Sequence, residues 1–135
     1  MNRVDVPHDR NVGLLAAVAD TNGMLQRLGG DWELFDQIVA ISLEDAPELV
    51  HAAREALARG DAKELRRSAH SLKSLMATLG ATGAANAAVT LEKCANGGDL
   101  SRASDLIRDC GDRVADVCRA MQAYADSGKA AGDGL

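Results

Sequence analysis

Apolar residues recur at helical spacing in four segments of the chain, and short turns that contain glycine separate these segments. The most regular seam has a 4-3-4-3 spacing and consists of Leu65, Ala69, Leu72, Met76 and Leu79. Aromatic residues make up only 2% of the chain, and Ala and Leu dominate, which favours helices over sheets. Because short turns join antiparallel neighbours, the pattern predicts an all-α fold, namely an antiparallel up-down four-helix bundle.

Aspartates and glycines mark where the long helices are expected to begin and end. Asp31 and Asp61 can cap the first two, and Asp99 or Ser101 can cap the last. The four helices are predicted over residues 31–60, 61–80, 82–97 and 99–125. Pro47 falls inside the first of them, where it removes a backbone donor, so a kink is favoured over a break near Asp45.

Two shorter apolar stretches precede these helices. Asn11 can cap the first, and Thr21 can cap a second that ends at Gly29, so we expect an N-terminal helical cap on the bundle. The predicted bundle domain covers residues 12–125. Residues 1–11 are predicted to be a polar N-terminal tail and residues 126–135 a flexible C-terminal tail.

Each helix is expected to bury one face. The first long helix is predicted to bury Leu34, Phe35, Ile38, Ile41, Leu49, Ala53 and Leu57. The last two are predicted to bury Ala84, Ala87, Ala88, Leu91, Cys94 and Ala95, and then Ala103, Leu106, Cys110, Val114, Val117, Met121 and Tyr124. The cysteines show no C-x-x-C spacing, which argues against a zinc site or a disulfide framework and favours reduced thiols in the cytoplasm.

Charge and hydropathy exclude several classes of function. The formal net charge is −5 and no Lys/Arg cluster is present, so binding to nucleic acid is not expected. No apolar run reaches the length of about 18 residues that a membrane span needs. No phosphate-binding loop or ATP-binding motif is present, so the chain is not expected to phosphorylate itself from ATP.

A reactive side chain stands out in the segment AHSLKSLMATLGA, residues 69–81. With the seam turned inward, an adjacent flank of the helix carries Arg66, His70, Lys73, Ser74 and Ala77. A neutral imidazole offers one nitrogen lone pair to an electrophile such as a phosphoryl group, and the ammonium of Lys73 could neutralise that group. Spacing alone does not distinguish this arrangement from an ordinary solvated face.

The same segment resembles the phosphoacceptor motif of histidine-containing phosphotransfer (HPt) domains, H-x-x-K-G followed by a glycine ten residues after the histidine. His70, Lys73 and Gly80 match this motif, whereas Ser74 stands where the family usually has glycine. Residues 27–50 and 56–73 are also similar to the segments that usually precede the motif in this family. The resemblance covers about residues 12–125 in all. Ser74 puts in question how closely a partner approaches and which partner is accepted.

The resemblance implies that His70 accepts a phosphoryl group from the phosphoaspartate of a receiver domain and passes it to another response regulator. Lys73 would stabilise the phosphoryl charge, while Mg²⁺ would be bound by the receiver and no cofactor by this chain. By position in the family pattern, Glu92 lies near the acceptor and could assist it, although a solvated helix residue is the alternative. Gly80 is interpreted as a left-handed helix cap.

Other features stay open. Arg66 and Arg67 could contact a phosphoryl group or the acidic rim of a partner, or could form a solvated basic face. The resemblance implies receiver domains as partners, and the domain would be either free-standing or the C-terminal part of a hybrid sensor kinase. The alternative function is a helical adaptor that is not phosphorylated, which the departure at Ser74 motivates. An enzyme with its own catalytic centre is disfavoured, because no second nucleophile or acid–base pair accompanies His70.

Overall fold

The computed structural model describes residues 12–133, with side chains through residue 127. Within this range the chain is all-helical, as predicted, and has no strand. The helices are α1 (Gly13–Val18), α2 (Thr21–Arg27), α3 (Trp32–Ala58), α4 (Ala62–Thr78), α5 (Thr82–Asn96) and α6 (Ala103–Asp133). The predicted N-terminal tail over residues 1–11 and the proposed cap at Asn11 lie outside the described residues.

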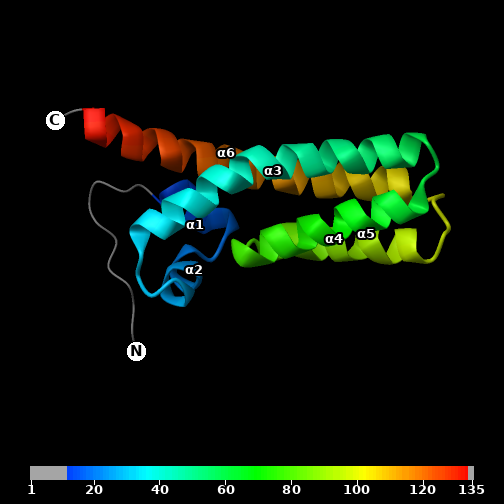
Figure 1. Ribbon diagram of the computed structural model, residues 1–135, viewed down its shortest axis with the longest axis horizontal. Coiled ribbons are helices and arrows are strands. Elements are labelled where there is room, and N and C mark those ends of the chain that lie inside the picture. Colours follow the sequence, from blue (N-terminus) through cyan, green and yellow to red (C-terminus); the bar gives the residue numbers. More distant parts are fainter. Residues whose placement is uncertain (1–11, 134–135) are drawn as a thin grey trace.

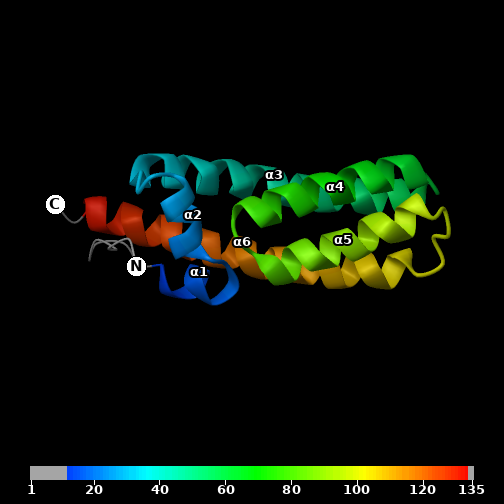
Figure 2. The same cartoon turned by 90° about the horizontal axis from the view of Figure 1, so that it is seen from below.

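The four long helices lie side by side, and the two short ones gather at one end (Figures 1 and 2). α3 has 27 residues and α6 has 31, whereas α4 has 17 and α5 has 15. The longer pair therefore extends beyond the shorter pair, since helix length grows by about 1.5 Å per residue. α1 packs on α6 and α2 contacts α3 in this region, so the short helices cover apolar surface that α4 and α5 do not reach.

Three of the helices have an aspartate as their N-cap residue. The side chains of Asp20, Asp31 and Asp61 accept hydrogen bonds from the backbone N–H groups three residues on, at 2.9, 3.0 and 3.1 Å. The predicted caps at Asp31 and Asp61 are thus confirmed. The cap of α2 is Asp20 and not Thr21, because the carboxylate one residue earlier reaches the free N–H groups of the first turn.

The structure excludes one alternative prediction and extends one predicted helix. α3 continues through Pro47 as one helix, so the alternative of a break near Asp45 is wrong. α6 continues to Asp133 and does not end near Tyr124, so residues 126–133 of the predicted flexible tail are helical. The glycines in this stretch each cost about 1 kcal/mol, but the neighbouring alanines are the best helix formers and no proline interrupts them.

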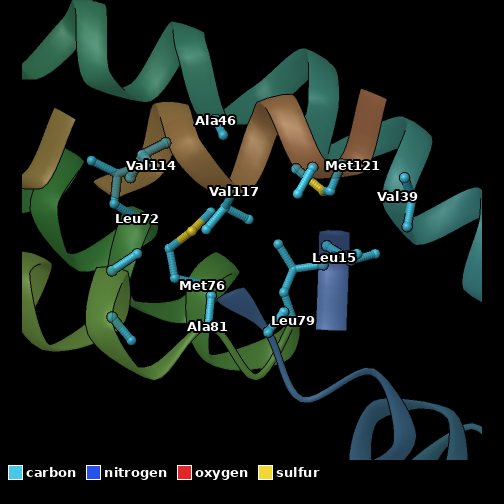
Figure 3. Packing of buried hydrophobic residues seen from close by; sticks show 14 of the residues in the cluster. Leu15, Val39, Ala46, Leu72, Met76, Leu79, Ala81, Val114, Val117 and Met121 are labelled. Atoms are coloured by element: carbon cyan, nitrogen blue, oxygen red, sulfur yellow. The ribbon is translucent and has the colours of Figure 1, made fainter. Parts of the chain in front are cut away.

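The core contains the predicted seam of α4, whose five residues are each at most 1% exposed. In Figure 3, Leu72, Met76 and Leu79 of this seam point toward α6 and α1. There they face Val114, Val117 and Met121 of α6 and Leu15 of α1. In the last two helices Cys94 and Leu106 are only half-buried, and Ile107 is buried instead of Leu106. No helix in the described part of the chain is long and apolar enough to cross a membrane.

The predicted buried face of α3 is largely wrong. Leu34 is 37% exposed and Ile41 is 55% exposed. The residues that α3 buries are Phe35, Val39, Ser42, Ala46, Val50, Ala53 and Ala56. The only hydroxyl among them is satisfied within the helix, because the Ser42 Oγ donates to the Ile38 carbonyl at 2.7 Å. A second apolar stripe of α3 is therefore left partly open to solvent.

Candidate functional site

α4 presents His70 on its outer surface. The buried seam fixes the rotation of the helix, since Ala69 and Leu72 on either side of His70 are at most 1% exposed. The His70 side chain is 56% exposed, and the Lys73 side chain, one turn later, is 33% exposed. The predicted solvent exposure of the ring is therefore observed.

Glu92 of α5 connects these two side chains. Its Oε2 lies 2.7 Å from His70 Nδ1, and its Oε1 lies 3.4 Å from Lys73 Nζ. α5 buries mainly alanines, such as Ala84 and Ala88, whose small side chains let it approach its neighbours closely. The alternative interpretation of Glu92 as an ordinary solvated residue does not fit its position, because the Glu92 side chain is only 20% exposed and its carboxylate contacts both His70 and Lys73.

The carboxylate of Glu92 sets the tautomer of the ring. Burial raises the pKa of Glu92, but hydrogen bonds from His70 and Lys73 outweigh this effect and hold the pKa below its usual value of 4.5. An ionised carboxylate only accepts hydrogen bonds, so His70 Nδ1 carries the proton and donates a hydrogen bond to Glu92. In the neutral ring the lone pair is then on Nε2, the nitrogen that Glu92 does not bind.

The other residues predicted for the site lie on the surface of α4 near His70. Arg66, Ser74 and Ala77 are exposed on the same side of α4. Arg66 makes no ion pair with any described residue. The guanidinium of Arg67 pairs with Glu64 at 3.0 Å, so Arg67 belongs to the solvated surface and not to the group around the ring.

A groove of about 660 Å³ opens beside His70 between α3 and α4. α4 lines it with His70, Ser71, Ser74, Leu75 and Thr78, and α3 lines it with Asp45, Glu48, Leu49 and Ala52. This contribution of α3 was not predicted from the sequence. The sequence feature that could have indicated it is a pair of carboxylates, at positions 45 and 48, which interrupt the apolar stripe on a face that was predicted to be buried.

Gly80 ends α4 ten residues after His70. Its φ of 71° is in the left-handed region, as a cap of this kind requires. The Gly80 carbonyl also accepts a hydrogen bond from the Asp20 backbone N–H at 3.0 Å, and a Cβ on Gly80 would lie 2.8 Å from the Cβ of Asp20. Glycine therefore serves both the turn after α4 and the close approach of the segment that leads into α2.

Comparison with known proteins connects this geometry to a family. A model of the Hpt domain family matches residues 37–126, which include His70, Lys73 and Glu92. The chain belongs to the Hpt domain family. It is thus a histidine phosphotransfer domain of two-component phosphorelays, whose partners are response-regulator receiver domains.

A solved structure supports the same conclusion. The crystal structure of histidine-containing phosphotransfer protein B (HptB) from Pseudomonas aeruginosa PAO1 is similar, with a TM-score of 0.68 and 28% sequence identity. The match covers 87% of this chain and 94% of that one. A comparison with curated protein sequences found no match.

Proposed function

We propose that Nε2 of His70 accepts a phosphoryl group from the phosphoaspartate of one receiver domain and later delivers it to an aspartate of another. The observation that supports this most strongly is the bond between His70 Nδ1 and Glu92, at 2.7 Å on a ring that is 56% exposed. It fixes the proton on one nitrogen and leaves the other nitrogen of an accessible ring with its lone pair.

The transfer step forms one bond and breaks one. The Nε2 lone pair attacks the phosphorus in line with the acyl oxygen, a P–N bond forms, and the P–O bond to the aspartyl carboxylate breaks. The carboxylate leaves with the bonding electron pair. The proton on Nδ1 stays in its hydrogen bond to Glu92, which balances the positive charge that develops on the ring. Delivery to the second receiver is the reverse of this step.

The neighbouring cations have separate roles in this proposal. Lys73 Nζ, held 3.4 Å from Glu92, is placed to neutralise oxygens of the bound phosphoryl group. Arg66 lies one turn before His70 and could reach the same group or the rim of the partner. We assign the Mg²⁺ that assists the transfer to the receiver, and none to this chain. Ser74 lines the groove where the partner approaches, so its hydroxyl bears on which receivers fit.

The wider setting is part of the proposal as well. We interpret α3 to α6 as an antiparallel up-down bundle on which α1 and α2 form the N-terminal cap; their side-by-side packing supports this. The domain would act as a free-standing carrier or as the C-terminal module of a hybrid sensor kinase, and a cytoplasmic location stays a prediction. In either setting it is a phosphocarrier without its own ATP site.

The direct test is to incubate the chain with phosphorylated receiver domains and to measure acid-labile label on it. Wild-type chain is expected to take up label, and His70→Gln is expected to take up none. Failure of wild type to be labelled by several competent receivers would favour the alternative, an adaptor that binds receivers without being phosphorylated. Label that persists in His70→Gln would place the acceptor elsewhere.

A further inference from the structure

The groove beside His70 carries unpaired negative charge. Asp45 and Glu48 line it from α3, both are exposed, and neither forms an ion pair with any residue that the structure describes. On the other side of the ring, Lys73 lies toward α5 through its contact with Glu92. His70 thus lies between the paired charges of Lys73 and Glu92 on the α5 side and two unpaired carboxylates on the α3 side.

The same groove is partly apolar. Leu49 and Leu75, both half-buried, line it together with Ala52. The stripe continues along α3 to Ile41, which is 55% exposed and lies one helical turn before Asp45. A surface of this kind, in which apolar side chains surround two carboxylates, fits a partner that offers apolar contacts and a positive charge.

A phosphoryl donor has to cover this groove when it reacts with His70. In-line attack brings the reacting atoms to about 3–3.5 Å, so the donor protein must close over the surroundings of the ring. Carboxylates that become buried without a partner destabilise the complex, whereas a Lys or Arg opposite them offsets that cost and also accelerates encounter. An acidic surface in the same place would be repelled.

We propose that Asp45 and Glu48 select among receiver domains, favouring those that present a Lys or Arg flanked by apolar side chains beside their phosphoaspartate. This inference rests on the proposed function of His70 and adds a determinant of partner choice to it. The determinant lies on α3, whereas the phosphoacceptor group lies on α4 and α5. Receivers with an acidic rim at this position are poor donors and acceptors for this chain.

The test uses a receiver that labels the wild-type chain and measures transfer rates over a range of receiver concentrations. For Asp45→Lys/Glu48→Lys, the KM is expected to rise about tenfold or more at low ionic strength, with a much smaller change in kcat. The difference should shrink as added salt shortens the screening length from about 10 Å at 0.1 M to about 3 Å at 1 M. Asp45→Asn/Glu48→Gln should lie between this variant and wild type.

A matched control separates the groove from net charge. Asp112→Lys/Asp116→Lys changes the charge by the same amount on α6, which does not line the groove, and should stay within about twofold of wild type. Circular dichroism checks that both variants are folded. Changing the receiver's Lys or Arg to Glu should restore transfer to Asp45→Lys/Glu48→Lys.

The outcomes distinguish the inference from the proposed function. Equal KM values for the groove variant and wild type, or equal shifts in the groove and α6 variants, would overturn the inference while leaving His70 as the acceptor. A dimer of the chain that the groove variant disrupts, without any change in KM, would overturn it too and assign the groove to a second copy. Absence of label on wild type would instead remove the proposed function itself.

Discussion

Replacing Glu92 by Ala is expected to slow phosphoryl transfer to His70 about tenfold. The variant loses the acceptor that holds Nδ1 at 2.7 Å and the carboxylate that holds Lys73 at 3.4 Å. Hydrogen bonds to charged groups contribute about 1.5–3 kcal/mol, and the 56% exposure of the ring places this one at the lower end. A loss of about 1.4 kcal/mol in transition-state stabilisation corresponds to a tenfold slower reaction.

Rapid-quench measurement of transfer from a phosphorylated receiver gives this rate, and Glu92→Gln is the matched control. The glutamine oxygen can still accept from Nδ1 but carries no charge to balance the ring, so Glu92→Gln should be slower than wild type and faster than Glu92→Ala. Nitrogen-15 NMR of the ring should show the proton on Nδ1 in wild type and in Glu92→Gln, and a mixture of tautomers in Glu92→Ala. A Glu92→Ala chain that reacts at the wild-type rate, or slows without any change in tautomer, would refute this reasoning.

Three further substitutions test separate parts of the account. Lys73→Ala should leave the fold intact but slow transfer or shorten the lifetime of the phosphohistidine, and unchanged kinetics in both directions would remove Lys73 from the site. Gly80→Ala should lower the free energy of unfolding by about 2 kcal/mol in urea titration, because its φ is 71° and its Cβ would lie 2.8 Å from Asp20; an unaltered midpoint would contradict this. Gly111→Ala should raise Tm by about 3 °C, since it gains about 1 kcal/mol of helix propensity, while its Cβ would lie 2.8 Å from the end of the flexible Arg54 side chain and at an ordinary 3.5 Å from Val50; a lower Tm would show that Arg54 cannot move aside.

The sequence predicted α4 well and α3 poorly for a physical reason. In α4 one seam alone is apolar, so Leu65 to Leu79 had to face the core. α3 has two apolar stripes, one that includes Leu34 and Ile41 and one that includes the small residues Ala46 and Ala56. The buried stripe is the one whose alanines let α3 lie close to its neighbours. Which stripe is buried depends on the partner helices, and the pattern within one helix contains no information about them.

The candidate site was predicted in part for the same reason. His70 and Lys73 lie one turn apart on one helix, so local spacing brings them together. Glu92 is 22 residues from His70, and only the packing of α4 on α5 shows that its carboxylate contacts both. The groove depends in turn on α3, whose buried face was predicted only in part. Contacts between helices were therefore the part that required the structure.

The most direct measurement of the central claim is NMR spectroscopy of the chain after phosphorylation by a receiver domain. The account predicts a phosphorus-31 signal coupled to Nε2 of His70, with Nδ1 still protonated toward Glu92. A phosphoryl group on Nδ1, on another residue, or on no residue at all would contradict it.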